Sequence, residues 1–347
     1  MGVVERQVAE RRGVSATVPV LDVSDLAIRF AAHPPGIHVA DGVSLSVGPG
    51  KTLCVVGESG CGKSIVSLAV MGLLPKPAAT VTAGAVRFEG RDLLALSEHA
   101  LADLRGDRMA MIFQEPMTAL NPAFTIGDQI AESVVRHRDC SQAQGRARAR
   151  DMLERVRIPA AATRLDAYPH EMSGGMRQRA MIAMALANDP TLLIADEPTT
   201  ALDVTIQAQI LALIRQLQTE SGTAVVLVTH DLGVVAEVAD EVAVMYAGRV
   251  VERGQVADIF DDPQHPYTIG LLGSMPGLGK RVGRLAAIPG SVPPPEAFSS
   301  ACRFASRCPF VTARCTSERP PLRALGIGNH RVACFEAPIE TISGRVR

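Results

Sequence analysis

The chain has 347 residues, of which 47% are hydrophobic and 20% charged, so it can bury a core of ordinary globular size. Its formal net charge of −1 and its aromatic content of 3% exclude a broad basic or base-stacking surface, so we expect no nucleic-acid partner. No apolar run approaches the roughly 18 residues of a membrane span, and the N-terminal residues lack the apolar stretch of a signal peptide, so we expect a cytosolic protein.

The N-terminal part of the chain begins with a predicted flexible tail and continues with strands. Apolar segments separated by turn residues predict these strands, and the turn SVGPGK joins the last two. A helix follows and is ended by Pro75. The expected elements are the tail at 1–20, strands at 20–30, 42–47 and 52–57, and the helix at 64–74.

The rest of the chain alternates between helices and strands. This alternation predicts an α/β fold, with a parallel sheet covered by helices. Several prolines after about residue 262 predict a loop-rich extension. The other expected elements are a mostly helical region at about 97–188 with a solvated Arg-rich face at 145–157, strands at 191–196 and 224–229, a helix at 206–219 and a strand hairpin at 241–254.

The segment GESGCGKS, residues 57–64, follows an apolar strand, opens a helix and fits the phosphate-binding pattern G-x-x-x-x-G-K-S/T. Backbone N–H groups of such a loop point at phosphate oxygens, and the positive end of the helix attracts them. We expect Lys63 to reach the β- and γ-phosphates of ATP and Ser64 to ligate Mg²⁺. The expected ATP contacts are Gly57, Ser59, Gly60, Cys61, Gly62, Lys63 and Ser64.

Cys61 lies inside this loop, next to Lys63 and the start of the helix. A neighbouring cation and a helix N-terminus both favour a thiolate. One interpretation is therefore a reactive thiol whose alkylation blocks ATP binding. The alternative is a small buried residue without reactivity.

The segment LLIADEP, residues 192–198, is an apolar strand that ends in two carboxylates. We expect Asp196 to join the Mg²⁺ ligands and to help bind ATP, and Glu197 to polarise the water that attacks the γ-phosphate. Gln114 follows a short apolar strand and could reach Mg²⁺ or that water, with a solvated loop glutamine as the alternative. His230 ends another strand and could bond the γ-phosphate, although a lone His is more often structural.

The segment MSGGMRQR, residues 172–179, is not expected to contribute to the ATP site of its own chain. Together with the phosphate loop, Gln114, LLIADEP, TALD at 200–203 and His230, it makes the chain resemble the nucleotide-binding subunit of ABC transporters over about residues 21–260. The resemblance implies an ABC-type P-loop ATPase core with a helical subdomain and an antiparallel β subdomain. It also implies that two chains share each ATP, because the signature residues of one subunit contact the γ-phosphate held by the other. The implied partner-facing residues are Ser173, Gly174, Gly175 and Gln178, with Asp203 across the interface.

Adenine recognition has no clear residue in this sequence. The family usually places an aromatic side chain on the adenine just before the strand at 42–47, but residues 31–40 contain no Phe, Tyr or Trp. Phe30 is the nearest upstream candidate, and His38 is the alternative.

Residues 261–335 are similar to the oligopeptide and dipeptide importer ATPases, through DDPQHPYTIGLLGSMP, AAIPGS, CRFASRCPF and HRVAC. In that subfamily four cysteines, here Cys302, Cys308, Cys315 and Cys334, hold a 4Fe–4S cluster. Their spacing alone says only that they can converge on a metal, and zinc or unligated thiols stay open as alternatives. Neighbouring arginines could offset the charge of such a cluster, namely Arg303, Arg307 and Arg314.

The resemblance implies an ATPase subunit that drives import of di- or oligopeptides. It would pair with a second homologous ATPase, in a heterodimer, beneath two membrane permeases fed by an extracytoplasmic binding protein, and so lie peripherally on the cytoplasmic face of the cell membrane. The expected organisation is a tail at 1–20, an ATP-binding domain at 21–262 and a C-terminal extension at 263–347. The alternatives are an importer ATPase for a nickel chelate, glutathione or a sugar, and a soluble ABC ATPase outside transport.

Overall fold

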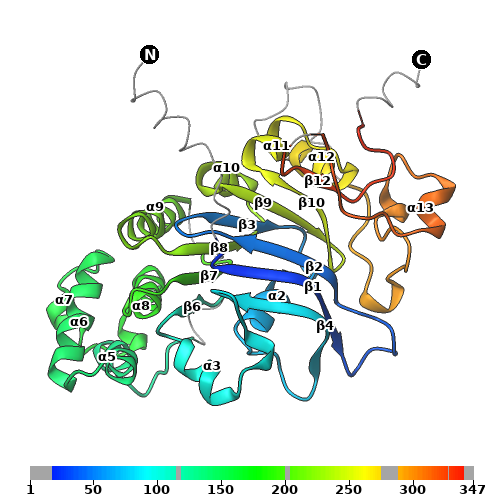
Figure 1. Cartoon of the computed structure of the whole chain (residues 1–347). Coiled ribbons are helices and arrows are strands. Elements are labelled where there is room, and N and C mark those ends of the chain that lie inside the picture. The colour runs from blue at the N-terminus through cyan, green and yellow to red at the C-terminus, as the bar shows by residue number, and fades with distance from the viewer. Residues whose placement is uncertain (1–17, 115–118, 200–203, 275–287, 327, 340–347) are drawn as a thin grey trace, which may run out of the picture.

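The computed structural model of the protein describes residues 18–114, 119–199, 204–274, 288–326 and 328–339 (Figure 1). The strands are β1 (Leu21–Phe30), β2 (Ala40–Val47), β3 (Thr52–Val56), β4 (Ala79–Phe88), β5 (Arg91–Asp92), β6 (Met109–Ile112), β7 (Leu192–Asp196), β8 (Ala224–Thr229), β9 (Glu241–Tyr246), β10 (Arg249–Gln255), β11 (Arg323–Ala324) and β12 (Arg331–Val332). The helices are α2 (Lys63–Val70), α3 (Glu98–Leu104), α5 (Ile126–His137), α6 (Gln142–Arg155), α7 (Ala161–Arg164), α8 (Gly174–Leu186), α9 (Val204–Ser221), α10 (Leu232–Val238), α11 (Val256–Asp261), α12 (Pro266–Gly273) and α13 (Ala313–Ser317). Short 3-10 helices are η2 (Leu93–Ala95), η3 (Pro169–Glu171), η4 (Pro295–Ala297) and η5 (Ala305–Arg307).

The larger sheet has the strand order β11-β12-β10-β9-β3-β8-β7-β6. Its strands β6, β7, β8, β3 and β9 are parallel, as the alternation of strands and helices predicts, because a parallel connection needs a crossover segment. β3, β7 and β8 are buried along their whole length, which explains their unbroken apolar sequences. The carboxyl ends of these parallel strands lie at one edge of the sheet.

Alternate residues of the parallel strands face two hydrophobic cores, because successive side chains of a strand point to opposite faces. In β3, Cys54 and Val56 belong to the core that contains residues of α5, α6, α8 and α9. Leu53 and Val55 belong to the core that contains residues of β1, β2 and α2. The sheet is therefore covered on both faces, and the predicted α/β fold is confirmed.

The smaller sheet is antiparallel, with the order β2-β1-β4-β5. It corresponds to the antiparallel β subdomain that the resemblance implies. β4 is not predicted from the sequence, and it pairs along β1 from Phe30↔Ala79 to Leu21↔Phe88. Most β4 side chains are exposed or half-buried, so its sequence lacks the apolar alternation of a strand against a core. Gly84 permits the pairing where β1 bulges, since a Cβ there would lie 2.5 Å from the carbonyl oxygen of Asp25.

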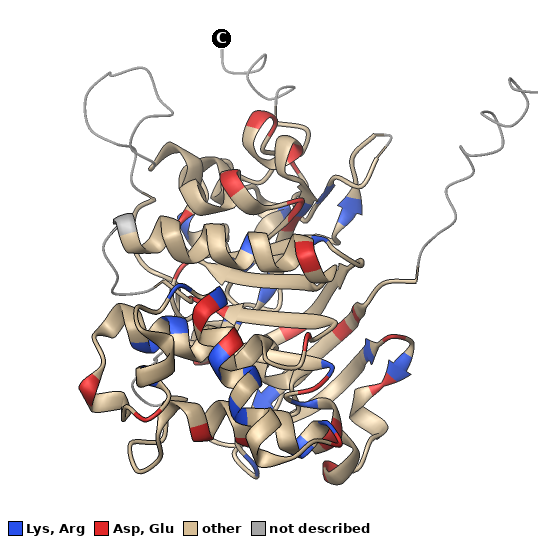
Figure 2. Ribbon diagram, turned by 90° about the vertical axis from the view of Figure 1, so that its left-hand side faces the viewer, with Lys and Arg blue, Asp and Glu red and all other residues tan. Residues whose placement is uncertain are grey.

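The arginines of α6 bind acidic side chains rather than only facing solvent. Arg146 pairs with Asp128 of α5 and with Asp166. Arg148 pairs with Asp189 at 2.8 Å, just after α8. Basic and acidic segments accordingly lie close together over these helices (Figure 2). Exposed pairs of this kind contribute about 0–1 kcal/mol each, so the apolar contacts among α5, α6 and α8 hold these helices together more strongly. Within the described residues, no helix has both the length and the apolar character that crossing a membrane requires.

The residues after 262 are joined to the rest of the chain through the larger sheet. β12 pairs with β10, and β11 extends the same edge. Beneath this edge, the buried carboxylate of Glu252 accepts hydrogen bonds from His330 Nε2 at 2.8 Å and from the backbone N–H of Gln264 at 2.6 Å and of His265 at 2.9 Å. The segment predicted as loop-rich therefore contributes two short strands to the sheet.

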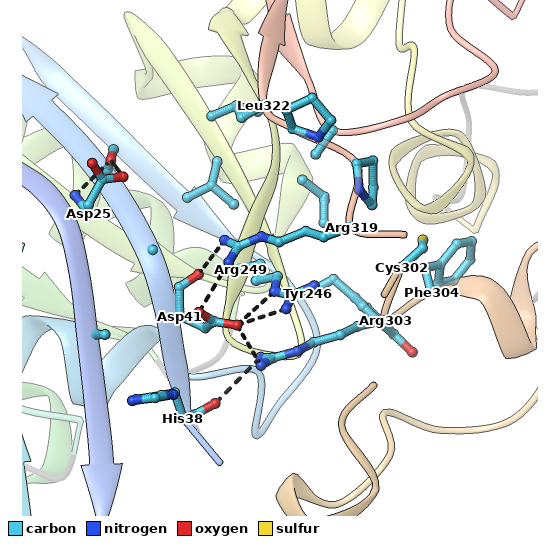
Figure 3. A pocket seen from close by; sticks show the side chains of 18 of the residues that line it. Asp25, His38, Asp41, Tyr246, Arg249, Cys302, Arg303, Phe304, Arg319 and Leu322 are labelled. Atoms are coloured by element: carbon cyan, nitrogen blue, oxygen red, sulfur yellow. Dashed lines mark hydrogen bonds and ion pairs between the residues drawn. The ribbon is translucent and has the colours of Figure 1, made fainter. Parts of the chain in front are cut away.

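A second joint connects this C-terminal segment to β2. Asp41 pairs with Arg249 and Arg303 at 2.8 Å each and with Arg319 at 3.2 Å, and the three arginines line a cavity of about 890 Å³ (Figure 3). Burial alone would raise the pKa of Asp41, but the guanidinium groups, Arg249 first, hold it below its usual value. The carboxylate of Asp41 thus pairs with one arginine of β10 and with two arginines after residue 300.

Candidate functional site at the carboxyl edge of the sheet

The phosphate loop, residues 57–64, connects β3 to α2 and needs glycine at two places. A Cβ on Gly57, whose φ is 154°, would lie 2.2 Å from the carbonyl oxygen of Met245. A Cβ on Gly62, whose φ is 100°, would lie 2.9 Å from the carbonyl oxygen of Val39. The loop is therefore closed tightly against β9 on one side and against the chain before β2 on the other.

The ammonium group of Lys63 points back into the loop. Its Nζ donates hydrogen bonds to the carbonyl oxygens of Gly57 at 2.8 Å and Glu58 at 3.1 Å, and the residue is 5% exposed. Ser59 and Gly60 form the exposed tip of the same loop. A buried cation next to backbone N–H groups at a helix start is the arrangement that binds phosphate oxygens.

Cys61 is buried within the loop, with 1% of its surface exposed. Burial raises the pKa of its thiol above the usual value, although the ammonium group of Lys63, whose Nζ lies 3.9 Å from Sγ, acts in the opposite direction. Burial therefore argues against a reactive thiolate, because the loss of hydration outweighs the attraction of one cation. The alternative, a small buried residue, describes the structure.

Two of the expected Mg²⁺ ligands lie side by side. Ser64 Oγ donates a hydrogen bond to Asp196 Oδ1 at 3.1 Å, which joins the start of α2 to the end of β7. Burial raises the pKa of Asp196, and the charge of Glu197 raises it further. The negative charge of the Asp196 carboxylate is therefore not fully balanced by the groups around it. Hydroxyl and carboxylate oxygens are the donors that Mg²⁺ prefers, and these residues fit that ion.

Glu197 lies between the two other predicted catalytic side chains. Gln114 Nε2 donates to Glu197 Oε2 at 3.4 Å, and His230 Nδ1 lies 3.3 Å from the same oxygen. Glu197 has a left-handed φ of 46°, and its backbone N–H donates to the carbonyl oxygen of Val228 at 2.9 Å. Such a conformation costs a non-glycine residue about 1–3 kcal/mol. Residues from the ends of β6, β7 and β8 thus meet at one carboxylate.

The signature segment opens α8 at the surface. Ser173 caps the helix, with Oγ accepting a hydrogen bond from the backbone N–H of Met176 at 3.3 Å. Ser173 and Gly174 are exposed, and a Cβ on Gly174 would meet nothing within 4 Å. Gly175 faces α9, where a Cβ would lie 3.7 Å from Ile206 Cγ2. The first turn of α8 can therefore present backbone N–H groups to an anion held outside this chain.

Gln178 points the other way. It is 2% exposed, and its Nε2 donates to the carbonyl oxygen of Pro198. The side chain of Gln178 is therefore held inside this chain, and its expected contact with the partner's ATP has no support in this geometry. It instead connects the signature helix to the residue that follows Glu197. Asp203, predicted at the same interface, lies outside the described residues.

The candidates for adenine stacking lie where the C-terminal segment meets the chain before β2. The ring of Phe30 lies edge-on to His33, with centroids 6.2 Å apart, and His33 Nδ1 lies 2.6 Å from Glu296 Oε1. His38 lines the cavity of Figure 3. The choice between Phe30 and His38 stays a prediction.

The four C-terminal cysteines lie near one another. The backbone N–H of Cys302 donates to the carbonyl oxygen of Cys315 at 3.2 Å. Burial, helped by the charges of the neighbouring thiols, raises the pKa of Cys308 to about 12 and that of Cys334 to about 11. These four and the other three cysteines are all free. Within the described parts of the chain, no three His, Cys, Asp or Glu side chains are arranged as metal ligands, so the geometry does not support the predicted 4Fe–4S cluster.

The arginines beside these cysteines bind carboxylates. The pairs are Arg303–Asp41 at 2.8 Å, Arg307–Glu58 at 3.1 Å and Arg314–Glu318 at 3.0 Å. Their ion-pair partners are therefore carboxylates, and the expectation that these arginines offset the charge of a thiolate cluster stays a prediction.

Two residues that the sequence analysis did not identify reach the phosphate loop. Arg307 pairs with the carboxylate of Glu58, and the hydroxyl oxygen of Tyr267 accepts a hydrogen bond from the backbone N–H of Glu58 at 2.8 Å. Their only signal in the sequence is their place in segments that resemble importer ATPases. A spatial contact across more than two hundred residues leaves no local pattern.

Two family models match the chain. Residues 40–200 match the model described as ABC transporter, and residues 251–315 match the model described as oligopeptide/dipeptide transporter, C-terminal region. The first match contains the phosphate loop, Gln114, the signature segment and Glu197, whereas His230 lies beyond it. The second match contains Arg307, Cys302, Cys308 and Cys315.

The chain is similar to named proteins over most of its length. It is 52% identical over 319 residues to a probable peptide ABC transporter ATP-binding protein of Sinorhizobium fredii, covering 92% of this chain and 95% of that protein. It is 51% identical over 318 residues to a putative peptide import ATP-binding protein of Brucella melitensis, covering 88% and 94%.

Solved ABC cassettes share the fold. The dimeric post-hydrolysis structure of the ATP-binding cassette MJ0796, bound to ADP and Pi, has a TM-score of 0.61 at 26% identity and covers 68% of this chain and 98% of that one. CbiO1 from Clostridium perfringens, part of the ABC transporter complex cbiONQ, has a TM-score of 0.60 at 26% identity and covers 70% and 91%. The chain therefore belongs to the ATP-binding proteins of ABC transporters, ATPases that couple ATP hydrolysis to transport.

Proposed function

We propose that the chain is the ATP-hydrolysing subunit of an importer for di- or oligopeptides. One observation carries the ATPase part: Glu197 is held by Gln114 and His230 at the same sheet edge as the phosphate loop. The peptide part is supported by the match of residues 251–315 to the oligopeptide/dipeptide transporter region and by the names of the relatives.

The phosphate loop and the strand ends have separate tasks in this proposal. Backbone N–H groups of the loop and Lys63 bind the triphosphate, and Ser64 and Asp196, with Gln114, would hold Mg²⁺. When bound, Mg²⁺ neutralises the charge on the β- and γ-phosphate oxygens. Glu197 orients the attacking water, and its contacts with Gln114 and His230 keep the carboxylate at the edge where the γ-phosphate ends. His230 bonds the γ-phosphate.

Hydrolysis in this proposal needs a second, homologous ATPase. Ser173, Gly174 and Gly175 are supported as the contacts to the partner's γ-phosphate by the exposure of the first turn of α8. Asp203 would lie across the interface. The proposed pair is a heterodimer, and the related cassette MJ0796 was solved as a dimer.

The ATPase pair would act beneath two membrane permeases that receive cargo from an extracytoplasmic binding protein. This arrangement puts the chain peripherally on the cytoplasmic face of the cell membrane. We assign residues 21–262 to the ATP-binding domain, with a helical subdomain at about 97–188 that receives the permeases, and residues 263–347 to a C-terminal extension. Closing of the pair on ATP would move the permeases, and hydrolysis would reset them.

We also propose that Cys302, Cys308, Cys315 and Cys334 hold a 4Fe–4S cluster. The support is the donor set, four free cysteines after residue 300 in a segment that resembles the importer ATPases, although their described side chains are not arranged as metal ligands. The cluster would act as a structural clamp, because metal–thiolate binding adds folding free energy to a segment with little core of its own. Anaerobically purified protein should then be brown with about four irons per chain, and Cys308→Ser should lose them. Colourless protein with one tightly held zinc, or with no metal, contradicts the cluster.

The transport proposal is tested by reconstitution. The chain is co-expressed with a candidate second ATPase, two permeases and a binding protein, and the complex is placed in proteoliposomes. ATP-dependent uptake of a labelled dipeptide or oligopeptide, lost with Lys63→Ala, is the expected result. Uptake of a nickel chelate, glutathione or a sugar without peptide uptake would contradict the cargo while keeping the transporter.

A further inference from the structure

Glu58, the second residue of the phosphate loop, is held from three directions. Its backbone N–H donates to Tyr267 Oη at 2.8 Å, and its Oε2 accepts from Arg307 Nη1 at 3.1 Å. Its carbonyl oxygen accepts from Lys63 Nζ at 3.1 Å. The atoms that fix Glu58 therefore also fix one of the two carbonyls that hold the phosphate-binding ammonium group.

The groups that hold Glu58 are themselves rigid. Tyr267 is fully buried, and its ring lies 4.7 Å from that of Tyr246 and 5.5 Å from that of Phe304, centroid to centroid. The side chain of Arg307 is 7% exposed. Packed aromatic groups of this kind have few alternative rotamers. A displacement of the C-terminal segment is therefore passed on to Glu58 and is not taken up by side-chain movement.

The guanidinium group of Arg307 donates hydrogen bonds to several acceptors. Besides Glu58, it donates to the carbonyl oxygens of Pro289 at 2.8 Å and Gly290 at 3.2 Å, and to Tyr246 Oη at 3.3 Å. A guanidinium group held at several points is pre-organised, so it sets where the Glu58 carboxylate lies. The loop is thus attached to the C-terminal segment by an ion pair that is mostly shielded from water.

The phosphate loop works through the direction of its backbone N–H groups, and small displacements of such groups weaken anion binding strongly. None of the family's ATP motifs contains Tyr267 or Arg307. We propose that Tyr267 and Arg307 are positioning residues for ATP binding: they hold Glu58, and through it the loop and Lys63, in the conformation that accepts the triphosphate. The C-terminal segment thereby contributes to the ATP affinity of its own chain. This inference rests on ATP binding at the loop, as in the proposed function.

Cys308 follows Arg307 directly, and Cys302 lies two residues before Phe304. The same short segment therefore carries both the cysteines and the loop contacts. Any change that shifts this segment would move Arg307 relative to Glu58. Through its contacts with the loop, the C-terminal segment can thus affect the ATP site of its own chain without a partner subunit.

The test measures ATP affinity in the full-length chain and turnover in the pair that this chain forms with the second ATPase. Binding of a fluorescent ATP analogue gives Kd, and steady-state hydrolysis gives KM and kcat. Arg307→Ala is expected to raise Kd and KM by about tenfold with kcat changed less than about twofold, as for a lost coupled contact. Arg307→Lys should recover part of the affinity. Glu58→Gln combined with Arg307→Ala should cost less than the sum of the two single changes.

Tyr267→Phe provides a second variant that keeps the packed ring and removes only the acceptor of the Glu58 N–H. It should raise Kd with little change in melting temperature. Arg319→Ala is the matched control, since Arg319 also joins the C-terminal segment to a carboxylate, Asp41, but does not contact the loop. It should leave Kd unchanged.

Unchanged Kd in both Arg307→Ala and Tyr267→Phe would overturn the inference. An equal rise of Kd in Arg319→Ala would also overturn it, since general loosening of the C-terminal segment would then explain the effect. Failure of the wild-type chain to bind the analogue would contradict the proposed ATP site itself, which distinguishes the two proposals.

Discussion

His230 Nδ1 lies 3.3 Å from Glu197 Oε2, and this contact joins the ends of two neighbouring parallel strands. The register pairs Asp196 of β7 with Val228 of β8, so the residues that follow each strand meet at the sheet edge. Gln114 donates to the same carboxylate oxygen from the end of β6. The orientation of the Glu197 carboxylate therefore depends on residues from three strands, although 12% of its side chain stays exposed.

Glu197→Gln should keep ATP binding and slow hydrolysis by about 10²–10⁴-fold, because the water loses its polarising carboxylate while the phosphate contacts stay. The comparison variant is His230→Ala, which removes one contact of the carboxylate and should slow hydrolysis less. Single-turnover hydrolysis and analogue binding measure the two effects. Near-normal turnover in Glu197→Gln would remove Glu197 from the mechanism.

Gly174→Asp should abolish ATP-driven pairing while the separate chain keeps its fold and its ATP affinity. The fold tolerates a side chain, because a Cβ on Gly174 meets nothing within 4 Å. The added carboxylate would face the partner's γ-phosphate and cost several kcal/mol by Coulomb repulsion. Gly174→Ala is the control and should pair nearly normally. Size-exclusion chromatography with ATP in a hydrolysis-deficient background measures pairing, and unchanged pairing by Gly174→Asp would rule out the signature contact.

The sequence predicted the fold and the motifs well at positions where few residue types allow the required burial or backbone conformation. The apolar runs of β3, β7 and β8 predicted buried parallel strands, and the glycine-rich loop between β3 and α2 was recognisable because few other sequences allow its backbone. The carboxylates at the end of β7 and the imidazole after β8 are predicted to lie at one edge because the ends of parallel strands coincide. The distances among Gln114, Glu197 and His230 agree with that reasoning.

Residues whose partners are distant in the sequence escaped prediction. Arg307 was assigned to a thiolate cluster because Cys308 is its neighbour, yet its nearest carboxylate is Glu58. The signature motif suggests Gln178 as a contact to the partner's ATP, although its side chain is buried and donates to the carbonyl oxygen of Pro198. Burial likewise reversed the expectation for Cys61. Sequence shows the neighbours along the chain, whereas pairing and burial depend on the complete packing.

Cys61 should react slowly with a maleimide near neutral pH. It is 1% exposed, and burial raises the pKa of its thiol, so little thiolate is available. Cys140, which is partly exposed, should be labelled first, and ATP hydrolysis should survive that labelling. Peptide mapping by mass spectrometry identifies the labelled site. Rapid labelling of Cys61 with loss of activity and protection by MgATP would contradict the buried position.

The joint between β10 and the C-terminal strands should weaken as pH rises. His330 Nε2 lies 2.8 Å from Glu252 Oε1. The pKa of His330 is raised, first by the hydrogen bond with Glu252 and then, against the effect of burial, by the charges of Glu252, Asp258 and Asp262. A base whose pKa is higher in the folded than in the unfolded chain stabilises the fold fully below its unfolded pKa, about 6.5. That contribution is lost as pH rises through the folded pKa.

The opposite sign applies to His265, whose pKa burial lowers to about 3. Unfolding lets it bind a proton below about pH 6.5, so acid destabilises the fold through this residue. The effect of His330 is therefore isolated by comparing the wild type with His330→Gln at each pH. The wild type should melt at the higher temperature near pH 6, and the difference should shrink near pH 9, because only the protonated imidazole pairs strongly with Glu252. His170→Gln, at an exposed position, should show no such difference at either pH. A gap between the wild type and His330→Gln that stays constant from about pH 6 to pH 9 would mean that the joint depends on packing rather than on the charge of His330.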